Sequence, residues 1–105
     1  MSETPQSVVI ALEGDLDIAS RGHVRALLEA VSTRPVAIVD LTNVDFIGST
    51  GVTELLYAFQ KRRERGLEAM RLVVAPGATV NRVIEIAGLD KVFGIYHTIA
   101  DAQDA

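Results

Sequence analysis

The sequence contains no cysteine and no tryptophan, and it has only five other aromatic residues (three Phe and two Tyr) among 105. Without cysteine, disulfides and thiolate metal sites are excluded, which fits a reducing compartment. No apolar run approaches the roughly 18 residues needed to span a bilayer. Residues 1–6 have neither the basic start nor the apolar core of a secretory signal. We therefore predict a cytoplasmic protein without membrane insertion.

An excess of positive charge is also missing, since 10 Lys and Arg stand against 14 Asp and Glu, for a net charge of −4. Nucleic-acid binders usually present a basic face, so no direct contact with DNA or RNA is expected. The basic residues that do occur gather at Lys61, Arg62, Arg63 and Arg65. We interpret them as a solvated helix end whose cations complement the negative end of the helix dipole. A docking patch for an acidic partner is the alternative.

Apolar residues are plentiful, at 49% of the chain with a mean hydropathy of +0.27. This content and length predict one folded domain rather than a disordered chain. We place a flexible tail at residues 1–6 and a single domain at residues 7–105.

Strand-like and helix-like segments alternate along the chain. Apolar runs typical of strands cover residues 7–12, 36–41, 70–75 and 92–95. Apolar stripes at helical spacing lie within residues 24–31, 52–59 and 80–87, and residues 98–102 could add a helical turn. This order predicts an α/β sheet with helices packed on it.

The limits of these elements follow from local signals. Gly14 and its acidic neighbours predict a turn, after which residues 15–18 could form a short second strand, so the sheet is not expected to be purely parallel. Ser20 is expected to cap the first helix through its hydroxyl. Arg34 and Pro35 are expected to end that helix, and Gly88 is expected to follow the third helix.

The segment from Asp40 to Gly51 leads from a strand through a turn into a helix. Ser49 and Thr50 stand in the turn between Gly48 and Gly51, so their hydroxyls are expected at a helix N-terminus. Free N–H groups and the helix dipole favour negative charge there, and a phosphate would bring about −1.5 to −2. The alternative is that Ser49 only caps the helix and Thr50 only enters its first turn.

Enzyme-like patterns are weak, and we predict a protein without catalytic residues, cofactor or metal. The glycines around Ser49 do not have the spacing of a nucleophile elbow, and no P-loop or metal-ligand cluster is found. His23 and His97 lack orienting partners and are expected at the surface. Asp40 suggests the phosphoacceptor of a receiver domain, with Glu13, Asp15 and Asp17 as the acidic pair, but no lysine follows residues 70–75.

Three segments together resemble the STAS domain family, and within it the bacterial anti-sigma-factor antagonists. Residues 14–17 resemble a G-[DE]-[LI]-D turn, and residues 40–52 resemble the signature D-L-S-x-V-x-F-[IM]-D-S-[ST]-G-[LV]. Residues 75–92 resemble the late strand–helix segment of the family. The resemblance implies a small mixed sheet of four to five strands with about four helices packed mainly on one side.

The resemblance also implies a partner switch that regulates transcription. An antagonist of this type binds an anti-sigma factor, which is a serine kinase of the ATP-binding histidine-kinase-like fold, and so releases a sigma factor. Phosphorylation ends the binding, and a phosphatase resets it. By this resemblance Ser49 is the phosphorylated residue, with Thr50 as second choice. The implied partner-binding residues are Asp15, Asp17, Gly48, Ser49, Thr50, Gly51 and Thr53.

One departure from the family pattern matters for function. The family usually has aspartate directly before the serine, whereas this chain has Gly48. The missing carboxylate leaves an alternative function open, in which the STAS domain is not phosphorylated. It would then act as a scaffold or regulatory subunit of a transporter or signalling complex.

Overall fold

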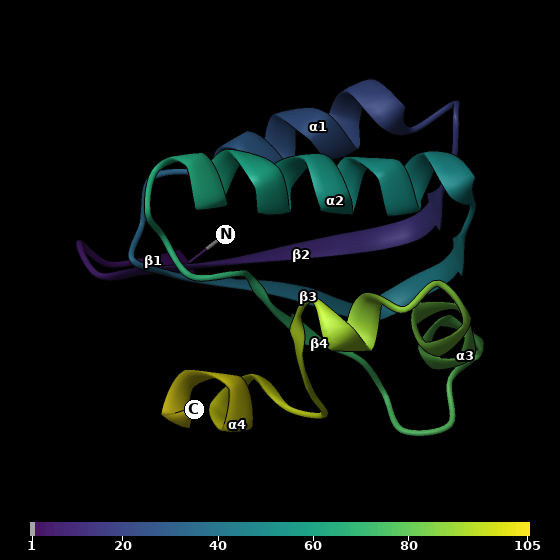
Figure 1. Cartoon of the computed structure of the whole chain (residues 1–105). Helices are drawn as coiled ribbons and strands as arrows, with labels where there is room; N and C mark the ends of the chain where they lie inside the picture. The colour runs from purple at the N-terminus through teal and green to yellow at the C-terminus, as the bar shows by residue number, and fades with distance from the viewer. Residues whose placement is uncertain (1) are drawn as a thin grey trace.

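The computed structural model describes residues 2–105, of which Ser2 is described by its backbone alone. Five strands and four α-helices follow one another, with a short 3-10 helix between α3 and β5 (Figure 1). They are β1 (Ser2–Glu3), β2 (Ser7–Leu16), α1 (Arg21–Glu29), β3 (Val36–Ile47), α2 (Ser49–Glu64), β4 (Arg71–Val73), α3 (Thr79–Ile86), η1 (Leu89–Lys91), β5 (Gly94–Tyr96) and α4 (Ile99–Asp104). Within the described residues, no helix combines the length and apolar character needed to cross a bilayer.

The strands form one sheet in the order β1-β2-β3-β4-β5. The pairs from β2 to β5 are parallel, and β1 adds an antiparallel edge to β2. The predicted mixed sheet is therefore confirmed, but its antiparallel member comes from residues 2–3 and not from residues 15–18. Because β1 pairs only two residues, the flexibility expected for residues 1–6 and the domain boundary at residue 7 stay predictions.

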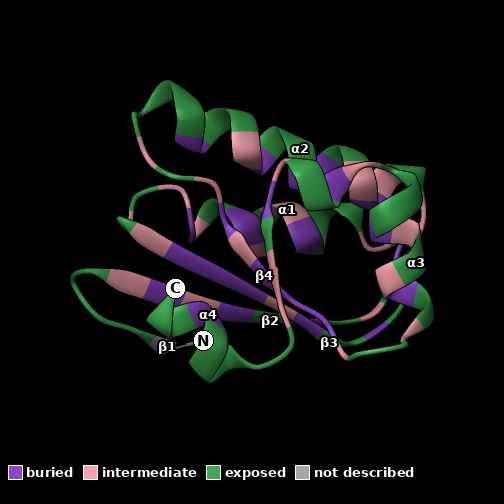
Figure 2. Ribbon diagram, turned by 60° about the horizontal axis from the view of Figure 1, so that its bottom comes forward, coloured by how far each residue is buried: buried purple, intermediate pink, exposed green. Residues whose placement is uncertain are grey.

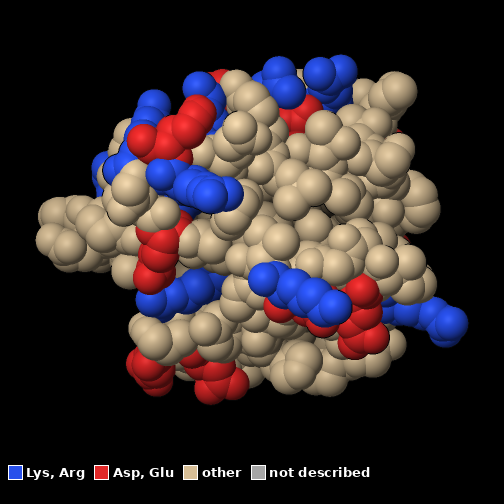
Figure 3. Space-filling view, viewed as in Figure 1, with Lys and Arg blue, Asp and Glu red and all other residues tan. Residues whose placement is uncertain are grey.

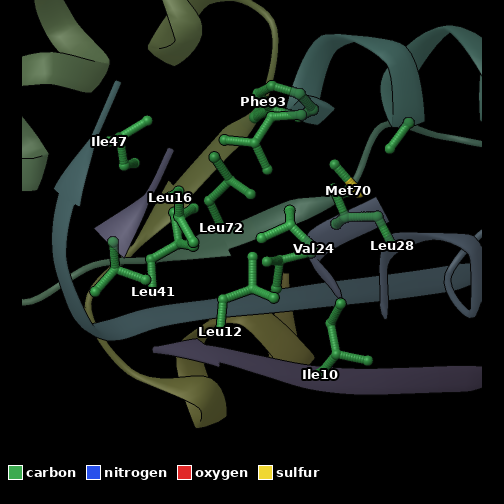
Figure 4. Close-up of a cluster of buried hydrophobic side chains, with 14 of the residues drawn as sticks. Ile10, Leu12, Leu16, Val24, Leu28, Leu41, Ile47, Met70, Leu72 and Phe93 are labelled. Carbon is green, nitrogen blue, oxygen red and sulfur yellow. The ribbon is translucent and has the colours of Figure 1, made fainter. Parts of the chain in front are cut away.

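The helices lie mainly on one face of the sheet, as expected. Side chains from α1, α2 and α3 share the main core with that face of β2, β3 and β4, and Figure 4 shows part of it, including Leu12, Val24 and Leu72. The shorter α4 covers part of the opposite face, where Ala102 packs with Ile38 and Val73. The buried strands between these layers are visible in Figure 2.

Strand β2 does not end at Gly14, so the predicted turn there is wrong. Gly14 has a positive φ of 73°, yet it stays paired with Val44 of β3. The register shifts on either side of Gly14, between Ala11 and Glu13 and again between Gly14 and Asp15. At each shift β3 has one residue more than β2, as in a β-bulge. Backbone pairing with β3 thus carries the strand past a residue that by itself indicates a turn.

Some helix and strand limits also differ from expectation. Helix α1 ends at Glu29, before Arg34 and Pro35, and its last turn closes with bonds from the N–H groups of Ala30 and Val31 to carbonyls three residues back. Strand β4 is shorter than residues 70–75, and β5 lies further along than residues 92–95. The predicted helices within 52–59 and 80–87 are confirmed, and Gly88 follows α3 with a φ of 73°.

Candidate functional site

The turns after β2 and β3 lie together at the end of the sheet where α1 and α2 begin (Figure 1). The carbonyl ends of parallel strands are where α/β proteins commonly place binding sites. The N–H of Gly48 donates to the carbonyl of Leu16 at 3.0 Å, which joins the two turns directly. Asp15, Asp17 and Ser49 therefore come from segments that are bonded to each other.

The turn after β2 is held by Ser20, in a different way from the one predicted. Its hydroxyl donates to the Asp15 carbonyl at 2.8 Å and accepts from the Asp17 N–H at 3.0 Å. The Ser20 N–H donates to Oδ1 of Asp17 at 3.2 Å. Ser20 stands at the N-cap position of α1, but its side chain accepts no bond from the first turn of that helix. Its hydroxyl instead shapes the turn, and Asp15 is left exposed.

Helix α2 begins with an open N-terminus. Gly48 is its N-cap residue in extended geometry, with no side-chain cap and no acidic residue in the first turn. Ser49 is the first helical residue and is exposed. Among the described residues the Ser49 hydroxyl has no hydrogen-bond partner, while its carbonyl accepts from the Thr53 hydroxyl at 2.9 Å. Ser49 therefore does not cap the helix, and its hydroxyl is free to react or to bind.

Gly51 allows the first turn of α2 to approach β2 closely. A Cβ atom at this position would lie 2.8 Å from both the Cβ and the carbonyl oxygen of Leu16 and 3.0 Å from Cγ2 of Ile47. Real Cβ atoms essentially never stand at 2.8 Å from other heavy atoms, so any larger residue would push α2 away from the sheet. Gly51 is buried, so we expect it to shape the site and not to touch a partner.

Phe46 is an exposed aromatic residue beside the site that the sequence analysis did not single out. It pairs with Asp15 of β2 and is 51% exposed. A Cβ atom at Gly48 would meet its Cε2 at 3.1 Å, so the ring lies against the start of α2. Because Phe46 alternates with Val44 along the strand, the sequence pattern predicts a buried side chain, and only the register shift in the pairing with β2 leaves it exposed.

Glu54 ties α2 to α1 from a buried position. It is 1% exposed and binds both Arg21 (Nε to Oε1, 3.1 Å) and Arg25 (Nε to Oε2 and Nη2 to Oε1, both 3.0 Å). The hydrogen bonds and charge of Arg25, with those of Arg21, lower the pKa of Glu54 against the opposing effect of burial. Helices α1 and α2 each begin at one of the two site turns. The two ion pairs therefore fix the position of these turns relative to each other.

Arg62 is the exception in the basic cluster, because it is fully buried and not solvated as predicted. Its guanidinium donates to the carbonyls of Val31, Arg34 (2.8 Å), Pro35 (3.0 Å) and Glu68 (2.7 Å). Burial lowers its pKa. These four bonds tie α2 to the connection between α1 and β3 and to the loop before β4.

The other cations of the cluster lie at the surface. Lys61 and Arg25 both lie over the ring of Tyr57, and Arg65 bonds to Ser32. A groove of about 310 Å³ runs between α1 and α2 past these side chains. Figure 3 shows Lys and Arg gathered near the C-terminal end of α2, whereas the area toward its N-terminal end carries few charges.

The structure brings the predicted partner-binding residues together, but these residues differ in exposure. Asp15, Ser49 and Thr53 are exposed, Asp17, Gly48 and Thr50 are half-buried, and Gly51 is buried. Asp40 lies outside the site, where its carboxylate accepts from the Thr42 N–H at 3.0 Å. His23 and His97 are exposed, as expected. The described residues hold no group of three His, Cys, Asp or Glu that could bind a metal ion.

Known proteins resemble this chain over nearly its whole length. The family model described as STAS domain matches residues 1–102. The anti-sigma-F factor antagonist RsfB of Mycobacterium tuberculosis is 34% identical over 96 residues, which cover 90% of this chain and 76% of that protein. The crystal structure of an anti-sigma factor antagonist from Mycobacterium paratuberculosis is 28% identical, with a TM-score of 0.82 over 98% of this chain and 87% of that one.

A more distant structure shares the fold. SpoIIAA of Bacillus in its phosphorylated form is 21% identical, with a TM-score of 0.67 over 99% of this chain and 94% of that one. The family match spans β1 to α4 and includes both turns of the site. With a 34% identical relative over most of the same residues, it shows that this chain belongs to the STAS domain family.

Proposed function

We propose that this chain is an anti-sigma-factor antagonist that binds an anti-sigma serine kinase in the cytoplasm and thereby releases a sigma factor. Phosphorylation of Ser49 ends the binding, and a phosphatase restores it. The observation that carries the proposal is the exposed Ser49 hydroxyl at the open N-terminus of α2, which has no hydrogen-bond partner among the described residues. The antagonist role is supported by the names of the M. tuberculosis and M. paratuberculosis relatives. It is a binding role and needs no catalytic residue.

A phosphate at Ser49 is compatible with the fold. Among the residues that the structure describes, no side chain caps the first turn of α2, and no acidic residue stands in that turn, so a negative group is stabilised there. The partner, in contrast, has to bury the phosphate or lose contact with the turn. Moving a switch from 1:99 to 99:1 requires a difference of about 5.5 kcal/mol, and a doubly charged group removed from water against a close surface can supply much of it.

The first test is phosphate transfer. The purified chain is incubated with ATP and each anti-sigma kinase of its own genome, and its intact mass is then measured. One added phosphate is expected on the wild type and none on Ser49→Ala. A phosphate that persists in Ser49→Ala but is lost in Thr50→Ala would move the site to Thr50.

The second test is binding. Ser49→Asp is expected to weaken binding to the cognate kinase by about a hundredfold or more, because the new charge would be buried in the interface without a partner. Ser49→Asn introduces a side chain of nearly the same shape as aspartate but without its charge. This variant is expected to bind within about threefold of the wild type. Equal affinity of Ser49→Asp and Ser49→Asn would contradict the proposed switch.

A second candidate function is favoured by Gly48. Without the carboxylate that usually precedes the serine, the domain could serve as an unphosphorylated scaffold or regulatory subunit of a transporter or signalling complex. In that case Ser49→Ala behaves as the wild type in every assay. Affinity purification from the native host then recovers a transporter ATPase or a signalling complex and no anti-sigma kinase.

A further inference from the structure

The groove between α1 and α2 takes no part in the function proposed above. Ligand-binding clefts usually have volumes of about 300–1,000 Å³. At about 310 Å³ this groove has room for a small group, such as one side chain of a partner. Its lining includes the buried residues Leu28 and Ala58 and the ring of Tyr57, which is 43% exposed. An apolar side chain can therefore be buried in it.

The cations along the groove differ in how their charge is neutralised. Arg25 is paired with the buried carboxylate of Glu54. Lys61 and Arg65 are exposed, and neither forms an ion pair with a carboxylate among the described residues. Glu29 is the other carboxylate in the lining, so three cations stand against two carboxylates. The groove thus has a positive balance on a chain whose net charge is −4.

Arg65 is held in place with one edge of its guanidinium free. Its Nη1 donates to the carbonyl of Ser32 at 3.0 Å and contacts the hydroxyl of Ser32 at 2.8 Å. Its Nε and Nη2 have no hydrogen-bond partner among the residues that the structure describes. These two nitrogens form an edge that can bind a carboxylate through two parallel hydrogen bonds. Because Ser32 already orders the side chain, little further ordering is needed on binding.

The spacing of the two free cations suits an acidic peptide. Lys61 and Arg65 lie four residues apart on α2, and such side chains leave one helix face about 5–6 Å apart. Neighbouring side chains on one face of a peptide are separated by a similar distance, about 6–7 Å in a strand. Lys61 is also positioned over the ring of Tyr57, with Nζ 5.7 Å from the ring centroid. Two carboxylates of one segment can therefore reach both cations, which favours a peptide over a single small anion.

We propose that the groove between α1 and α2 is a second docking site, which binds an acidic segment of a partner protein that carries an apolar side chain. Arg65 and Lys61 bind carboxylates of the segment, and its apolar side chain lies on Leu28 and Ala58. Lys61 follows Ser49 by twelve residues, or about 18 Å along α2 (Figure 1). The site is therefore separate from the Ser49 surface and does not rest on the function proposed above.

The test uses a fluorescein-labelled peptide with glutamates on both sides of a central leucine, and fluorescence anisotropy at physiological salt measures its binding to the full chain. The wild type is expected to bind it. Lys61→Glu and Arg65→Glu are each expected to weaken binding by about tenfold or more, because a charged contact is lost and a repulsion gained. The same peptide with serine in place of leucine is expected to bind about fivefold more weakly, because no apolar group then fills the groove.

The matched control is Arg63→Glu, which changes the net charge as much as the other two substitutions. Arg63 is exposed and does not line the groove, so its affinity is expected to stay within about twofold of the wild type. Ser49→Asp should also stay within about twofold, because its distance exceeds the screening length of about 8 Å. Urea unfolding of each variant checks the fold. Lys61→Glu removes no hydrogen bond between described residues, so it decides the matter if Arg65→Glu unfolds.

The possible outcomes separate this site from the switch at Ser49. A wild type that does not bind the peptide, or equal losses in Arg63→Glu and Lys61→Glu, would overturn the docking site and leave the proposed switch standing. Displacement of the peptide by an equal concentration of phenyl phosphate would assign the groove to a small anion and overturn the peptide as its occupant. A large loss in Ser49→Asp would overturn the independence of the two sites.

Discussion

The two ends of helix α2 are built in opposite ways. At the N-terminal end Gly48 provides no side-chain cap, and the exposed Ser49 hydroxyl has no partner among the described residues. At the C-terminal end Arg62 is buried and donates to four carbonyls, and Arg65 bonds to the backbone and hydroxyl of Ser32. One end therefore presents a reactive group to solvent, while the other end anchors the helix to the rest of the domain.

The contrast fits the proposed switch, in which a free hydroxyl is placed on a rigid scaffold. A group that must be modified and recognised needs solvent access and free bonding capacity. The position of that group must still be defined, and here packing and ion pairs further along the same helix define it. Glu54 stands between the two ends and fixes α2 to α1 through Arg21 and Arg25. A change at the anchored end should cost stability, and a change at the exposed Ser49 should cost binding.

The largest effect is expected from Arg62→Met, which keeps much of the apolar stem but removes the guanidinium. The carbonyls of Val31, Arg34, Pro35 and Glu68 lose their donor. We expect a loss of about 3–5 kcal/mol in the free energy of unfolding, measured by urea titration. Arg63→Met, at an exposed neighbouring position, should change it by no more than about 0.5 kcal/mol. Equal stability of the two variants would show that α2 is not anchored through Arg62.

A smaller loss is expected from Glu54→Gln, about 2–3 kcal/mol, because an amide replaces a carboxylate that accepts three charged hydrogen bonds. The loss should depend on pH. The pKa of Glu54 is lowered in the folded state below its ordinary value of 4.5, so the unfolded state takes up the proton first.

The sign of this pH dependence follows directly. The stability that Glu54 contributes is fully present above pH 4.5 and is lost as the pH falls through the lower folded-state pKa. The difference in unfolding free energy between the wild type and Glu54→Gln should therefore shrink as the pH is lowered below 4.5 in parallel urea titrations. A difference that stays constant down to about pH 2 would mean that the pairing with Arg25 does not act through the charge of Glu54.

The smallest of the three stability losses is expected at the N-terminal end of α2. Gly51→Ala places a methyl group 2.8 Å from Leu16 and should cost about 2 kcal/mol of unfolding free energy. Gly48→Ala meets only the edge of the exposed Phe46 ring, and it should cost less than about 1 kcal/mol. Thermal unfolding of both variants checks this. If Gly48→Ala is the more damaging change, the open end is more tightly packed than the contacts of Gly48 indicate.

The helices were predicted well because their signal is local. The apolar spacing from Val52 to Phe59 is enough to predict most of α2, and Gly88 marks the end of α3. Sequence reasoning also found the site turns, since a serine between two glycines after a buried strand indicates a helix start. The motif at residues 40–52 then indicated the STAS family, which the family match confirms.

Strand limits and side-chain partners were predicted less well, because they depend on residues distant in the sequence. Gly14 indicates a turn by itself, but pairing with Val44 keeps it in β2. Ser20 suggests a helix cap, yet its hydroxyl bonds to Asp15 and Asp17. In the sequence Arg62 is one of several neighbouring cations that are expected at the surface. Only the fold places the carbonyls of residues 31–35 next to it.

By itself the sequence determined the α/β class, the main helices, the family and the place of Ser49 at a helix start, because periodicity and short motifs act over a few residues. Only the tertiary structure decided that Ser49 is left without a partner among the described residues, that Gly51 packs on Leu16 and that Phe46 lies exposed over Gly48. These properties arise where β2, β3 and α2 meet, and no single segment contains the atoms that set them.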